Sequence, residues 1–473
     1  MLVSNTAIAN RKKTSVAAKQ TPKLPAAHKS SSETGTGLLS DKYYLDNFNY
    51  LIGFVKQHYA HLFTSEEHQF CHSYASLTEN ARQLFVRLVL RTHAYLRLSK
   101  INYADIITSE GLTELSNNGF VNPDIDCIES CLHLFTRTEL SQALGSPLTN
   151  AGNIDLTAWT TPDLFGDSPA KKLLSNETIL EVNHKELVIT FRLLFFGNLH
   201  QDFSSFVLRD LGYQRYEAYT INHTTLLFKS REQLEAHLQY YSCVELFEDA
   251  CQLGSDALRE LSNSLPVKIL TDKSLCRRLD RLNNNIARQL ERETELDQAA
   301  LIYANTVHPP ARERLARIKE KQGKAHESLE ICRQILNTPQ DADELDFASQ
   351  FGQRLAKKSG QEFSATVVYK PPVKNLALEK SNLSVEFSVA LHLAKTGKCY
   401  YLENNLISGM FGLAFWDIIF ASVDGAFFHP FQTHPADFYD PEFSLSRKPL
   451  IEERLAEVSS GCLLYTSPSP RDS

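Results

Sequence analysis

LCRRLDRLNNNIARQLER, residues 275–292, places leucine or isoleucine at steps of three and four residues. A helix turns about 100° per residue, so this spacing gathers the apolar side chains on one face. That face holds Leu275, Leu279, Leu282, Ile286 and Leu290. The opposite face carries four arginines, namely Arg277, Arg281, Arg288 and Arg292. The segment therefore predicts a helix that packs on one side and presents a row of guanidinium groups on the other.

Two interpretations of the arginine row stay open. A guanidinium group offers a planar fork that matches two phosphate oxygens, so four in a row can follow a nucleic-acid backbone. Alternatively, the row is a solvated outer face, with Asp280 and Glu291 as acidic neighbours. The segment alone does not decide between them.

The sequence around this helix, residues 231–360, is almost purely helical in pattern. Turn signals divide it at Pro266, Pro309, Pro310, Gly323 and Pro339. Gly323, Ser328, Ile335 and Pro339 occupy positions close to the small-residue and proline positions of a tetratricopeptide repeat. We therefore expect helical hairpins packed in an array, with one or two degenerate repeats of that kind.

The N-terminal half predicts a smaller helical unit. Apolar residues from Tyr43 to Leu62 recur at helical spacing, and Thr64 with Glu67 forms a capping-box pattern for a second helix. Residues 105–121 have the helix-then-strand texture of a winged helix, with Gly119 expected as a left-handed helix cap. Further helices are expected at 132–144 and within 186–216.

The two ends of the chain differ from the rest. Residues 1–40 are rich in Ser, Thr, Ala, Lys and Pro, which predicts a disordered basic arm. Residues 462–472, CLLYTSPSPRD, resemble the in-frame translation of a transposase adapter used in DNA sequencing, although a natural Ser/Pro-rich tail is the alternative. We therefore exclude this tail from the fold and expect the biological sequence to be interrupted near residue 461.

Composition limits the possible functions. The 473 residues include 49 Lys and Arg against 56 Asp and Glu, a net charge of -7, so a uniformly basic nucleic-acid coat is excluded. The most apolar stretch, residues 410–423, is shorter than the ~20 residues of a membrane-spanning helix and contains Asp417. Nine cysteines occur without a Cys-x-x-Cys pair, and Cys127 and Cys131 could share a helix face. We expect reduced thiols, no membrane partner and a cytoplasmic location, nucleoid-associated if the source is bacterial.

Two other groups of residues are candidates for a site. Arg87 and Arg91 are interleaved with Tyr95 and Tyr103, a mixture that suits a surface facing DNA but is also found on ordinary charged helices. Glu386 follows Val385 on a predicted helix from 383 to about 396, where spacing alone makes it an exposed carboxylate.

Three long segments resemble the Fanconi-associated nuclease family. They are LFVRLVLRTHAYLRLSKINYADI (84–106), LLFFGNLHQDFSSFVLRDLGYQRYEAY (193–219) and GLAFWDIIFASVDGAFFHPFQTHPADFY (412–439). The resemblance extends in order over residues 41–461. It implies a mostly α fold with helical or winged-helix and SAP-like DNA-binding units, a tetratricopeptide-like helical array, and the start of an α/β nuclease domain of the PD-(D/E)xK class, called VRR-NUC.

The residue patterns and the resemblance together predict the boundaries of these parts. They are a basic arm at 1–40, a helical unit at 41–125, a SAP-like region at 126–230, a helical array at 231–365, an incomplete VRR-NUC domain at 366–461 and the adapter-like tail at 462–473.

The same resemblance implies an activity. Family members are expected to be structure-selective phosphodiesterases of DNA repair that cut branched or 5′-flap DNA and crosslinked DNA with Mg²⁺ or Mn²⁺. The family's first metal ligand corresponds by position to Glu386, whereas the following Asp and Glu-x-Lys find no match before residue 461, and Asp417 is interpreted as structural. We therefore expect this chain to be an inactive fragment of a nuclease. The alternative is a non-catalytic DNA-binding scaffold.

Overall fold

The computed structural model describes residues 40–103, 105–123, 131–144, 169, 173, 177–219, 221, 226–364, 372–378, 382–402 and 405–460. The predicted basic arm up to residue 39, Cys127 and the adapter-like tail lie outside these residues. The chain divides into two compact units. The first comprises residues 1–226 with 427–433, and the second comprises 227–426 with 434–473.

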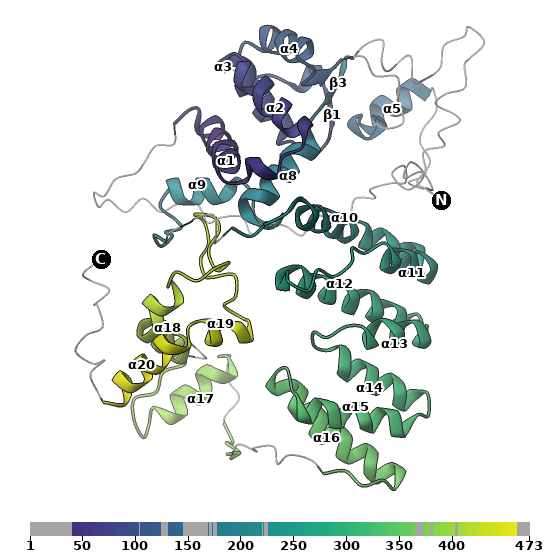
Figure 1. Ribbon diagram of the computed structural model, residues 1–473, viewed down its shortest axis with the longest axis vertical. Helices are drawn as coiled ribbons and strands as arrows, with labels where there is room; N and C mark the ends of the chain where they lie inside the picture. Colours follow the sequence, from purple (N-terminus) through teal and green to yellow (C-terminus); the bar gives the residue numbers. More distant parts are fainter. Residues whose placement is uncertain are drawn as a thin grey trace. The chain divides into compact units, whose positions relative to one another are not determined.

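The first unit combines helices with a small antiparallel sheet. Its strands are β1 (Tyr95–Arg97), β2 (Val121–Asn122) and β3 (Ile179–Val182), in the order β1-β3-β2. Figure 1 labels β1 and β3. The predicted boundary between residues 125 and 126 falls inside this sheet, because its central strand comes from later in the chain. The helices are α1 (Tyr43–Tyr59), η1 (Ala60–Leu62), α2 (Ser65–Ser76), α3 (Glu79–Val89), η2 (Leu98–Lys100), α4 (Thr108–Asn117), η3 (Leu132–Leu134), α5 (Arg137–Leu144), α8 (Lys185–Phe196) and α9 (Ser204–Asp210).

Local signals set several of these boundaries as predicted. The Thr64 hydroxyl accepts from the backbone of Glu67 while the Glu67 carboxylate accepts from the backbone of Thr64, which completes the capping box of α2. Gly119 follows α4 with a φ of 74°, in the left-handed region that glycine adopts at low cost. The expected helix at 132–144 is wrong in its extent, because a second capping pair, between Thr136 and Glu139, starts α5 only after a short 3₁₀ turn.

A segment from late in the chain, residues 427–433, completes the aromatic core of the first unit. The Phe431 ring lies 4.4 Å from that of Phe206, centroid to centroid. The Tyr219 hydroxyl donates to the backbone oxygen of His429 at 2.8 Å and accepts from the backbone nitrogen of Gln432 at 2.9 Å. These residues were predicted to belong to the region 366–461, but they pack with the N-terminal unit because their aromatic rings fill its core.

The second unit begins with an array of helices. They are α10 (Arg231–Leu253), α11 (Ser255–Asn263), α12 (Lys273–Arg292), α13 (Leu296–Ala304), α14 (Ala311–Lys321), α15 (Ala325–Asn337) and α16 (Ala342–Ser359), and successive helices pack against one another (Figure 1). At the repeat-like positions, Gly323 has a φ of 76° and the buried Ser328 hydroxyl donates to the Ala316 oxygen at 2.7 Å. The mostly α class and the tetratricopeptide-like array are thus confirmed.

The rest of the second unit contains α17 (Val385–Leu393), α18 (Asn405–Ile419), α19 (Pro441–Ser446) and α20 (Lys448–Ser459). Arg447 is fully buried and pairs with Asp437 at 2.7 Å. Asp417 pairs with Arg454 at 2.8 Å, which ties α18 to α20 and agrees with the structural role expected for it. Large apolar side chains of these helices remain exposed, among them Ile407, Met410 and Trp416.

Two further expectations concern thiols and membranes. The described cysteines are in the reduced form, outside any disulfide; they are Cys71, Cys131, Cys243, Cys251, Cys276, Cys332 and Cys399. Within the described ranges, none of the helices combines the length and the apolar character that crossing a membrane requires.

Candidate nucleic-acid interface

Helix α12 is anchored at its first turn. The Asp272 carboxylate accepts from the Leu275 backbone at 2.9 Å, which caps the helix, and lies 2.8 Å from Nε2 of the buried His237. Burial by itself would raise the pKa of Asp272, but the hydrogen bond and charge of His237 act together with hydrogen bonds from the Leu275 backbone and Gln233, so this pKa lies below its ordinary value. The predicted leucine and isoleucine face is buried throughout, which fixes the rotation of the helix and turns the arginine face outward.

Asp280 and Glu291, the two acidic neighbours of the arginines on α12, are buried against other elements. Asp280 is buried, pairs with Lys268, and accepts from the backbone nitrogens of Val307 and His308 at 3.2 and 3.1 Å. Glu291 is also buried and pairs with Arg314 at 2.6 Å. Asp280 and Glu291 are therefore not acidic neighbours on a solvated face, because both carboxylates are buried and join α12 to the following elements. Contact of the arginine row with phosphate stays a prediction.

The arginine row extends further than the sequence suggested. Lys273 lies four residues before Arg277, one helical turn away and on the same side. We call Lys273, Arg277, Arg281, Arg288 and Arg292 the basic stripe. Sequence analysis missed Lys273, although its i, i+4 spacing to Arg277 was a readable signal.

The residues of the basic stripe differ in their exposure and in their ion pairs. Arg281, Arg288 and Arg292 are exposed, and in the part of the chain that the structure describes they form no ion pair with a carboxylate. Arg277, by contrast, is half-buried and pairs with Asp440, while Lys273 pairs with Glu442.

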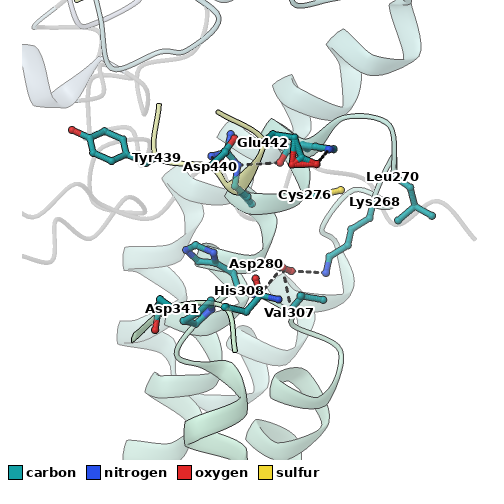
Figure 2. Close-up of a pocket in the computed structure, with 14 residues that line it drawn as sticks. Lys268, Leu270, Cys276, Asp280, Val307, His308, Asp341, Tyr439, Asp440 and Glu442 are labelled. Atoms are coloured by element: carbon teal, nitrogen blue, oxygen red, sulfur yellow. Dashed lines mark hydrogen bonds and ion pairs between the residues drawn. The ribbon is translucent and has the colours of Figure 1, made fainter. Parts of the chain in front are cut away.

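A cavity of about 460 Å³ adjoins the N-terminal end of the stripe. Figure 2 shows Asp440 and Glu442 on one side of it, with Asp280, His308 and Asp341 on the other. Burial and the positive charge of Arg281 both lower the pKa of His308, so the ring is neutral at pH 7. The cavity is thus lined by cations whose partners are carboxylates of the same chain.

The second predicted basic patch contains Arg87 and Arg91, whose side chains contact tyrosines and an aspartate. The Arg87 guanidinium lies between two tyrosine rings, 4.2 Å from the centroid of Tyr44 and 4.7 Å from that of Tyr103, and pairs with Asp105 at 2.8 Å. Arg91 donates to the Tyr103 hydroxyl at 2.7 Å. Tyr95 lies on β1, and its hydroxyl donates to the Glu181 carboxylate at 3.3 Å. Contact of Arg87 and Arg91 with DNA stays a prediction.

Glu386 lies in the first turn of α17 and is fully exposed. A hydrogen bond from its own backbone nitrogen and one from the Ser384 hydroxyl lower the pKa of its carboxyl group. Among the described residues, no cluster of three or more His, Cys, Asp or Glu side chains could hold a metal ion. One exposed carboxylate does not fit Mg²⁺ or Mn²⁺, which need several converging oxygens.

Comparison with known proteins identifies the family. Residues 42–122 match the family described as "FAN1, HTH domain". The Fanconi-associated nuclease 1 homolog of Pseudomonas aeruginosa is 31% identical over 433 residues, a match that covers 89% of this chain and 76% of the relative. The chain belongs to the Fanconi-associated nuclease family. The Arabidopsis thaliana homolog is 26% identical, with 88% of this chain and 54% of that protein covered, so the chain spans about half of the plant relative.

Solved structures agree with this assignment. The crystal structure of paFAN1 bound to DNA with a 2nt 5′ flap and a gap superimposes with a TM-score of 0.78 at 30% identity, covering 90% of this chain and 79% of that chain. The complex of paFAN1 with a 1nt 5′ flap gives 0.76 at 29% identity. The family resemblance seen in residues 84–106, 193–219 and 412–439 is therefore confirmed.

Proposed function

We propose that this chain is the DNA-binding part of a structure-selective, metal-dependent phosphodiesterase of DNA repair that acts on branched and 5′-flap DNA and on interstrand crosslinks. The observation that carries the proposal is the likeness to paFAN1 in complex with 5′-flap DNA over 90% of this chain. The exposed arginines of the basic stripe supply the phosphate contacts that such binding needs.

We further propose that most of the catalytic residues lie outside residues 1–461. Two observations support this. The described residues offer no cluster that could hold a metal. In addition, helices α17, α18 and α20 expose large apolar side chains, which a finished domain core would cover. Glu386 is then the first ligand of a Mg²⁺ or Mn²⁺ site whose other ligands, an Asp and a Glu-x-Lys, follow later in the gene.

A non-catalytic DNA-binding scaffold is the second candidate. The absence of a metal-holding cluster among the described residues favours it equally. The two candidates make the same prediction for DNA binding and differ only in cleavage, so a cleavage assay separates them.

The experiment compares cleavage of a 5′-flap substrate by four proteins with Mg²⁺ or Mn²⁺. They are the 473-residue chain, the completed gene product, and the completed product carrying either Glu386→Gln or the control Glu453→Gln on α20. We expect cleavage by the completed product and the control only, with binding retained in all four. Cleavage by the 473-residue chain would contradict the fragment proposal, full activity of Glu386→Gln would remove that residue from the site, and an inactive completed product would favour the scaffold.

A further inference from the structure

The N-terminal end of the basic stripe is covered by two carboxylates that flank the start of α19. Asp440 pairs with Arg277, and Glu442 pairs with Lys273. The Asp440 side chain is only 12% exposed and that of Arg277 is 29% exposed, whereas the remaining arginines of the stripe are open to solvent. This end of the stripe therefore differs from the rest in being closed by its own chain.

We propose that Asp440 and Glu442 act as intramolecular substitutes for phosphate, and that a nucleic-acid backbone must displace them to engage Lys273 and Arg277. The inference rests on the proposed DNA-binding function. A carboxylate presents two oxygens to a guanidinium group in nearly the geometry of a phosphate, so the two acceptors compete for the same donors. The contact is thus autoinhibitory: while it stays closed, DNA engages the open arginines but not Lys273 and Arg277, so fewer phosphates are neutralised.

The position of Asp440 shows that it has another partner available. Asp440 occupies the N-cap position of α19, where aspartate usually accepts from the helix backbone, yet it makes no such side-chain bond because its carboxylate is turned to Arg277. Released from Arg277, the carboxylate can cap its own helix. When a phosphate displaces Asp440, Arg277 donates to the phosphate and Asp440 accepts from the backbone of α19. Neither side chain is then left unpaired.

The charges around Asp440 weaken its ion pair with Arg277. Burial raises the pKa of Asp440 even though Arg277 opposes it, and the nearby carboxylates of Asp437 and Glu442 raise this pKa further. Three acidic side chains at one place repel each other, and this repulsion offsets part of the attraction between Asp440 and Arg277. The alternative is that Asp440 holds Arg277 in the orientation that DNA requires, in which case its loss weakens binding.

The test is equilibrium binding of 5′-flap DNA at several salt concentrations by the full 473-residue chain and its Asp440→Asn/Glu442→Gln variant. Glu452→Gln/Glu453→Gln, on α20, is the matched control because it removes the same two charges from exposed positions. Each cation that gains a phosphate steepens the dependence of log K on log salt by about 0.9, so we expect a slope steeper by roughly 1 to 2 in the variant and not in the control. Affinity at low salt should rise by up to about fivefold per released cation.

The outcomes separate the inference from the function on which it rests. An unchanged slope, weaker binding, or an equal change in the control would overturn the inference while DNA binding by the wild type stands. No salt-dependent binding by any of the three proteins would overturn the proposed function itself. Glu442→Gln alone, which alters only the exposed pair with Lys273, keeps the test valid if the double variant does not fold, and it should steepen the slope by about 0.9.

Discussion

Acidic pH should lower the stability of the first unit because of one buried histidine, His429. His429 is 1% exposed in the aromatic core, and its Nδ1 accepts from the Phe431 backbone at 3.2 Å. Burial lowers its pKa from 6.5 to about 3. Between those values the unfolded chain holds a proton that the folded chain lacks, so stability falls as pH falls below 6.5. Each pH unit costs about 1.4 kcal/mol, or about 2 kcal/mol between pH 6.5 and 5.

His429→Asn removes the titrating ring but keeps an acceptor for Phe431, so we expect it to abolish this part of the pH dependence. The free energy of opening is measured by hydrogen exchange of the α8 amides in urea at pH 7.5 and 5.0. His326→Asn, at an exposed position on α15, is the control and should retain the wild-type loss. An equal loss in wild type and His429→Asn would refute the reasoning.

Three further predictions concern the array and the chain end. Glu291→Gln leaves two cations without their buried partner and should destabilise the second unit by about 3 kcal/mol in urea denaturation, whereas the exposed Glu330→Gln should cost less than about 0.5 kcal/mol. Gly352→Ala places a Cβ 2.2 Å from the ring of Phe363, so its thermal midpoint should fall by an amount equivalent to about 1–3 kcal/mol. Deleting residues 462–473 should leave the thermal midpoint unchanged, and a clear drop would show that the tail belongs to the fold.

Local chemistry made much of the fold predictable. The periodicity of residues 275–292 predicted both the buried and the open face of α12, and the Thr64–Glu67 pair predicted the start of α2. These features depend on residues within one or two helical turns of each other. The family resemblance likewise rested on long contiguous segments.

Contacts between distant residues account for what the sequence did not predict. Asp280 and Glu291 looked like surface acids because the partners that bury them, in the turn after α13 and on α14, are remote in the sequence. The placement of residues 427–433 in the first unit depends on rings more than 200 residues earlier. The pairing of Asp440 with Arg277 is of the same kind. Helical periodicity carries no information about such partners.

The most direct test of the account is whether the 473-residue chain prefers 5′-flap DNA to a blunt duplex of equal length. We predict tighter binding to the flap, a steep decline of affinity with salt, and a weakening on replacing Arg277, Arg281, Arg288 and Arg292 with Gln that is the same for every DNA sequence, because phosphate contacts carry no base information. Equal affinity for both DNAs, or binding that neither salt nor the four substitutions reduce, would contradict it.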